Sequence, residues 1–84
     1  MLRARICVTL RAGVLDPQGE TIASSLNRLG FDEVTGVRAG KYLELTVDGD
    51  DPEVARSRVD EMCRRLLANP VIEDYSIEIE EDRS

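Results

Sequence analysis

The sequence has no histidine and no tryptophan, and its only aromatic residues are Phe31, Tyr42 and Tyr75. Without histidine it lacks the side chain that most often acts as a general base or metal ligand near neutral pH. Cysteine is also scarce. Cys7 and Cys63 stand far apart, whereas a zinc site usually takes four ligands in closely spaced pairs. We therefore expect no catalytic, cofactor-binding or metal-binding residue.

A basic surplus and long apolar runs are missing as well. The net charge is −6 and the isoelectric point is about 4.5, which argues against binding nucleic acid by neutralising phosphates. No apolar run approaches the length of a membrane span. The start, Met1–Arg5, leads directly into an alternating pattern, which predicts no signal peptide. With both thiols reduced, the expected compartment is the cytoplasm.

The length and composition that are present fit one small globular domain. The chain has 84 residues, so we expect a single domain over 1–84 with a small aliphatic core. Apolar residues make up 42% and charged residues 33%, which separates the chain from disordered proteins. Acidic residues gather near the end. We interpret this run as a solvated edge rather than a binding site, with residues 78–84 frayed.

The first half predicts a strand and a helix. Apolar side chains alternate from Leu2 to Leu10, as in a strand with one buried face. Asp16 suits a helix N-cap and Pro17 the first helical position, because proline has no amide to lose there. Gly30 suits the helix end, so this helix is predicted over 17–29.

The second half predicts three further elements and a turn. Residues 31–38 read as a strand with a bulge at Gly36, followed by a tight turn at Ala39–Gly40 and a strand over 42–47. Asp51–Pro52 repeats the helix-start signal, and a helical period continues to residue 68. Asn69–Pro70 ends that helix, and a last strand is predicted over 71–79.

This β-α-β-β-α-β order predicts an α+β, ferredoxin-like two-layer sandwich, with a four-stranded antiparallel sheet and both helices on one face. Cys7 would lie on the helix-free face and Cys63 between helix and sheet, so we expect no disulfide between them. The helix-free face would be largely polar. We expect a homo-oligomer, dimer or tetramer, built through this face or an edge strand, because the core of each copy is small.

Two places invite a functional reading. Asp16 lies near Gln18, Gly13 and Gly19, where a ligand could approach the backbone at a helix N-terminus. Capping is the favoured role of Asp16, and its carboxylate would compete with a bound anion.

Arg38 and Lys41 make a basic spot at the predicted turn on an acidic chain. Charged hairpin tips are common, and the functional alternative is a docking point for an acidic partner surface.

Four motifs together resemble the PurS family, the small subunit of phosphoribosylformylglycinamidine synthase. They are Gly13–Gly19 (GVLDPQG), Leu29–Phe31 (LGF), Val37–Lys41 (VRAGK), and Met62–Cys63 followed by Leu66–Tyr75 (LLANPVIEDY). The resemblance covers nearly the whole chain, in order. At Arg11–Ala12 the family often has lysine then proline, a difference that concerns loop stiffness.

The resemblance implies a role in de novo purine synthesis. The complex would convert formylglycinamide ribonucleotide, glutamine and ATP to formylglycinamidine ribonucleotide, glutamate, ADP and phosphate. A large synthetase subunit would use ATP and magnesium, and a glutaminase subunit would release ammonia. The PurS-like chain, as a dimer, would bridge these two subunits and support ammonia transfer without catalytic residues of its own.

We expect the loop at 13–19 and the turn at 38–41 to form much of the contact surface. The predicted partner-contact residues are Gly13, Asp16, Gln18, Gly19, Arg38, Lys41 and Asn69. One alternative is an ACT-like domain that senses a small molecule through its first strand-to-helix loop. Another is an acylphosphatase-like enzyme, for which Arg11 is nearby but the phosphate-cradling glycine pattern is missing.

Overall fold

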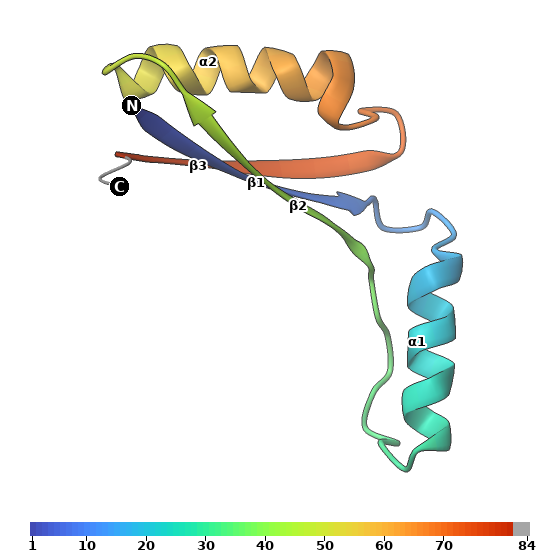
Figure 1. Cartoon of the computed structure of the whole chain (residues 1–84). Coiled ribbons are helices and arrows are strands. Elements are labelled where there is room, and N and C mark those ends of the chain that lie inside the picture. Colours follow the sequence, from blue (N-terminus) through green and yellow to red (C-terminus); the bar gives the residue numbers. More distant parts are fainter. Residues whose placement is uncertain (82–84) are drawn as a thin grey trace.

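A computed structural model describes residues 1–81 and shows a small sheet with one helix on it and a second helix apart from it (Figure 1). The elements are β1 (Leu2–Leu10), α1 (Pro17–Arg28), β2 (Gly40–Val47), α2 (Pro52–Met62), a π-helical turn η1 (Cys63–Leu67) and β3 (Glu73–Glu81). The three strands are antiparallel in the order β2-β1-β3. In the described part of the chain, no helix is long and apolar enough to cross a membrane.

The core lies between the central strand and α2. Ala4, Ile6 and Val8 alternate along β1 and are buried, as the period of two predicts. Val59 and Cys63 cover them from α2 and η1, and both are fully buried. α2 packs mainly on β1 and β3. It therefore covers that part of one face of the sheet and leaves β2 largely uncovered.

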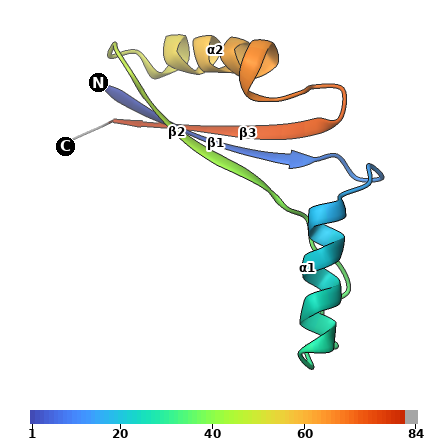
Figure 2. The ribbon, with the colours of Figure 1, turned by 45° about the vertical axis from the view of Figure 1, so that its right-hand side comes forward.

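The second helix belongs to an arm, which we define as α1 together with residues 29–39. Figures 1 and 2 show α1 projecting away from the sheet, with the chain that follows it returning alongside to β2. The molecule measures 48 × 30 × 15 Å and its radius of gyration is 16.2 Å. A compact chain of this length would have a radius of gyration of about 12 Å. The arm therefore leaves much of its own surface without an intramolecular partner.

The predicted four-stranded sandwich is wrong for this chain. The sheet has three strands within residues 1–81, because residues 31–38 form no strand and α1 does not cover the sheet. One feature of the sequence explains why residues 31–38 form no strand. Val34 and Val37 differ in parity, so this segment offers no continuous apolar face to a sheet.

The predicted tight turn at Ala39–Gly40 is also absent. The Ala39 amide, which such a turn would need, donates instead to the Asp16 carboxylate. Gly40 already pairs with Thr9 as the first residue of β2. The chain consequently runs straight through this point from the arm into the sheet.

Several other predictions are confirmed. Both helices begin at the predicted Asp-Pro pairs, and Gly30 follows α1 with a φ of +102°, a conformation that glycine adopts without strain. The long second helix becomes α2 plus η1, and the last strand begins at Glu73 instead of residue 71. Cys7 is exposed, Cys63 is buried, and both are free thiols. The predicted fraying of the acidic end is not seen at residues 78–81, which pair with β1 as part of β3, and residues 82–84 fall outside the described part.

Candidate interaction surfaces

Asp16 fastens the root of the arm by using both carboxylate oxygens. Its Oδ1 accepts a hydrogen bond from the Gly19 amide at 3.0 Å, which is the predicted N-cap. Its Oδ2 accepts from the Ala39 amide at 2.8 Å, on the returning side of the arm. The Gly19 and Ala39 amides hold the pKa of this carboxyl below its usual value of 3.8, because they stabilise the ionised form. One side chain thus joins both sides of the arm.

Close backbone packing tightens the same root. A Cβ placed on Gly19 would lie 2.3 Å from the Val37 carbonyl oxygen, so only glycine fits there without movement. Arg38 Nη1 also donates to the Leu10 carbonyl oxygen at 3.1 Å, which connects the arm to the end of β1. These contacts fix the direction in which the arm leaves the sheet.

A shallow hollow of about 410 Å³ lies beside the arm root. Its lining includes Arg11, Gly13, Leu15, Asp16 and Arg38. Three of the predicted contact residues, Gly13, Asp16 and Arg38, line this hollow, and the amide of a fourth, Gly19, donates to Asp16. Gln18 is exposed in the first turn of α1, and Lys41 is exposed near the start of β2.

Asn69 has a structural role in the turn before β3. Its side-chain oxygen accepts from the Val71 amide at 3.1 Å, and its own amide donates to Glu73 Oε1 at 2.6 Å. Arg11, which the sequence did not single out as a contact residue, ties this turn to the end of β1. Its side chain donates to the Pro70 carbonyl oxygen and lies 3.4 Å from the Asp74 carboxylate. The only sequence signal was its departure from the family pattern.

An apolar stripe runs along α1 and its C-terminal end, and the sequence predicted that it would face the sheet. Its residues are Ile22, Ala23, Leu26 and Leu29. Leu29 is 74% exposed and Phe31 is 48% exposed, and Ile22 is exposed as well. On the sheet, Leu43, Leu45 and Val47 of β2 are only half-buried. These three side chains share the face that carries α2 but lie beyond its main contacts. The molecule therefore has an uncovered apolar helix and an uncovered apolar strip of sheet.

The helix-free face is charged, which agrees with the largely polar face that the sequence predicted. Arg5 lies 2.7 Å from Glu80, and Arg3 lies 3.9 Å from Glu44 and 4.0 Å from Glu80. Such exposed pairs contribute little stability, but they keep this face hydrated. It is a poorer surface for tight self-association than the apolar stripe of the arm.

The described residues contain little that could perform chemistry. Over residues 1–81 no cluster of His, Cys, Asp or Glu could hold a metal ion. The Tyr75 hydroxyl donates to Asp60 Oδ1 at 2.6 Å, and this bond raises the pKa of the tyrosine and lowers that of the aspartate. Both shifts move the groups away from neutral pH, where a general acid or base would need to titrate.

Comparison with known proteins identifies the family of this chain. A sequence model of the PurS family, described as phosphoribosylformylglycinamidine (FGAM) synthase, matches residues 3–81. The PurS subunit of FGAM synthase from Synechocystis is 53% identical over 75 residues, covering 89% of this chain and 75% of the relative. This chain belongs to the PurS family. The PurS subunit from Methanocaldococcus jannaschii is 44% identical and covers 95% of this chain and 96% of its own length.

Solved PurS structures share the arrangement described above. Bacillus subtilis PurS superposes with a TM-score of 0.86 at 46% identity, covering 96% of this chain and all of that one. A chain of PurLQS from Thermotoga maritima has a TM-score of 0.83 at 34% identity, covering 95% and 99%. The chain is thus a PurS subunit of FGAM synthase, which is a ligase of purine biosynthesis. These relatives give no support to the ACT-like alternative.

Proposed function

We propose that this chain is the non-catalytic connector of FGAM synthase, which holds the synthetase and glutaminase subunits together and supports ammonia transfer between them. The observation that carries the proposal is the arm, a projecting apolar surface whose direction is fixed at its root by Asp16 and Arg38. The Thermotoga maritima structure named PurLQS contains a PurS chain in such a complex. ATP and magnesium are used by the synthetase subunit in this proposal, and the location is cytoplasmic.

The functional unit of the proposal is a dimer in which two copies exchange arms. In each copy, the apolar stripe of α1 would cover Leu43, Leu45 and Val47 of the other copy. This exchange removes both uncovered apolar surfaces at once, which is the main driving force for association. It also leaves the charged helix-free face in water.

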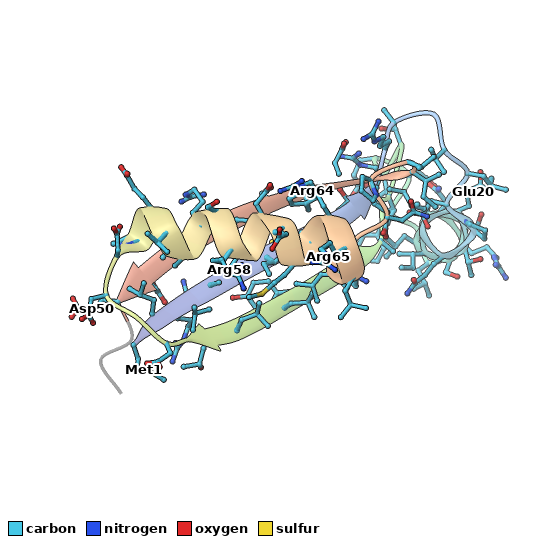
Figure 3. All side chains as sticks on the ribbon, turned by 90° about the horizontal axis from the view of Figure 1, so that it is seen from above. Met1, Glu20, Asp50, Arg58, Arg64 and Arg65 are labelled. Carbon is cyan, nitrogen blue, oxygen red and sulfur yellow. The ribbon has the colours of Figure 1, made fainter. Side chains whose placement is uncertain are left out.

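Charge on the flank of α2 supports the same exchange. Figure 3 shows Arg58 of α2 and Arg65 of η1 on the side that faces β2, and Arg64 of η1 on the opposite side. Glu20 lies in the first turn of α1, on the arm. An arm lying antiparallel to α2 would bring this acidic first turn toward Arg65. The exposed side chain of Leu66, next to Arg65, would be covered by the same helix.

A rigid dimer suits a connector because ammonia transfer requires two active sites to keep a fixed relation and to exclude water between them. The arm roots of both copies would then present Arg38 and Lys41, on an otherwise acidic protein, to the acidic surface of a partner. The neighbouring hollow, with Gly13 and Leu15, would belong to the same contact.

The proposal is tested by reconstituting the complex with the double variant Arg38→Ala/Lys41→Ala. We expect weaker assembly in size-exclusion chromatography with light scattering, while circular dichroism of the isolated variant stays unchanged. Lys41→Ala alone, which keeps the bond from Arg38 to the Leu10 carbonyl oxygen, should weaken assembly in the same direction. The matched control is Arg28→Ala, which removes an exposed arginine from the far end of α1. Unchanged assembly of the double variant, or equal weakening by the control, would remove this contact surface from the proposal.

A further inference from the structure

The outer edge of β3 is a second binding surface, separate from the arm. β3 lies at one end of the sheet order, so its far side has no strand beside it. The Arg11 amide donates to the Ile72 carbonyl oxygen, and the β1–β3 register continues from this pair. Hydrogen-bonded and non-bonded pairs alternate in an antiparallel ladder. The amide and carbonyl groups of Tyr75, Ile77 and Ile79 therefore point to the open edge.

A groove runs along this edge between β3 and α2. Its volume is about 690 Å³, and its lining includes Arg56, Asp60, Tyr75 and Ile77. Arg56 Nη1 donates to the Ile77 carbonyl oxygen at 2.8 Å. This bond confirms that the carbonyl points away from β1, and it occupies one acceptor of the edge.

We propose that the open edge of β3 binds an extended, basic segment of a partner protein by adding it as a further strand. In such strand addition the main-chain hydrogen bonds provide affinity, and alternate side chains provide specificity. Side chains of the added strand that lie on the α2 side would enter the groove. Those on the other side would lie beside Glu78 and Glu80.

The charge of β3 selects the occupant. Five of its nine residues are acidic: Glu73, Asp74, Glu78, Glu80 and Glu81. Glu80 is paired with Arg5 and Asp74 with Arg11, whereas Glu78 is exposed on the same strand. Lysine or arginine at alternate positions of an added strand would therefore meet carboxylates across the pair, which is favourable.

The same charges disfavour pairing with a second copy of this chain. If two β3 strands paired antiparallel around Ile77, Glu81 would oppose Glu73 and Glu80 would oppose Asp74 on both sides, and like charges opposite one another are unfavourable. Acidic residues on an edge strand also protect it from edge-to-edge aggregation. The inference goes beyond the connector role, because arm exchange uses β2 and leaves this edge open.

The experiment measures binding of a capped heptapeptide of alternating lysine and valine to the full chain. The comparison peptides replace lysine with glutamate, or carry N-methyl groups on alternate amides so that strand pairing is blocked. At low ionic strength we expect the lysine peptide to bind at least about tenfold more tightly than either comparison peptide. The amides of Tyr75, Ile77 and Ile79 should exchange more slowly with solvent in its presence.

Two variants separate strand addition from general charge attraction. Glu78→Lys should weaken binding of the lysine peptide, whereas Asp32→Lys, the same charge change at the exposed tip of the arm, should leave it unchanged. Arg56→Ala should bind about two- to fivefold more tightly, because the Ile77 carbonyl becomes available. Equal effects of Glu78→Lys and Asp32→Lys, or slowed exchange elsewhere than β3, would overturn the inference. Neither result would bear on assembly through the arm root.

Discussion

Replacing Leu29 by alanine tests whether a second copy of the chain covers the arm. In the single chain this side chain is 74% exposed at the end of α1 and belongs to the apolar stripe. The substitution removes three carbon atoms and keeps a residue with high helix propensity. It should therefore leave the fold of each copy intact and act almost entirely on association.

The magnitude follows from the exposed fraction. Burying three methylene-sized groups stabilises by about 2.4 kcal/mol, and about three-quarters of that is available for a partner to supply, or about 1.8 kcal/mol per arm. A dimer with exchanged arms loses this twice, or about 3.6 kcal/mol. The dissociation constant of the dimer should rise by several hundredfold.

Sedimentation equilibrium over a concentration series measures that constant directly. The matched control is Val71→Ala, because Val71 is 79% exposed but lies in the turn before β3, away from the arm. We expect the control to change the dissociation constant by less than about threefold. An unchanged constant for Leu29→Ala, or an equal change for Val71→Ala, would refute arm exchange.

Three further predictions concern the arm root and the two thiols. Gly19→Ala should destabilise the chain by about 1–3 kcal/mol in urea unfolding, because its Cβ would meet the Val37 carbonyl oxygen. Gly36→Ala has open space around its Cβ and should be close to neutral. Equal losses of stability for the two variants would contradict the packing argument. Asp16 has a lowered pKa in the folded chain, so its stabilising effect on the arm root is complete above pH 3.8 and is lost as the pH falls through the lower folded pKa. Amide exchange at Gly19 and Ala39, corrected for its intrinsic pH dependence, should lose protection in that range, and Asp16→Asn should remove this pH dependence. Cys7 should react with a thiol reagent in the native chain and Cys63 only after unfolding, because Cys63 is buried and burial raises the pKa of its thiol; rapid reaction of both would show that the core is open.

The sequence predicted those elements well whose formation depends on residues that are close together in the chain. Asp16–Pro17 and Asp51–Pro52 mark both helix starts, and the alternation from Leu2 to Leu10 marks the buried central strand. The failure lies in how the first helix and residues 31–38 are placed. An apolar stripe shows that one face of a helix packs against another apolar surface. It does not show whether that surface belongs to the same chain or to another one.

The structure brings some of the predicted contact residues together and keeps others apart, for a related reason. Asp16, Gly19 and Arg38 converge at the arm root, as the loop motifs suggested, whereas Asn69 serves its own turn. The second bond of Asp16 joins residues that lie 23 positions apart, so no local pattern reveals it. Arg11 was missed because its partners, Pro70 and Asp74, come together only in the folded chain.

The central claim, that this chain connects two enzymes without reacting itself, is tested most directly by comparing two ammonia sources. Purified synthetase and glutaminase subunits are assayed for formylglycinamidine ribonucleotide with glutamine or with saturating ammonium, with and without this chain. We predict that the chain is required for the glutamine-driven reaction, in fixed proportion to the other subunits, and that ammonium largely bypasses this requirement. Full glutamine-driven activity in its absence would contradict the account.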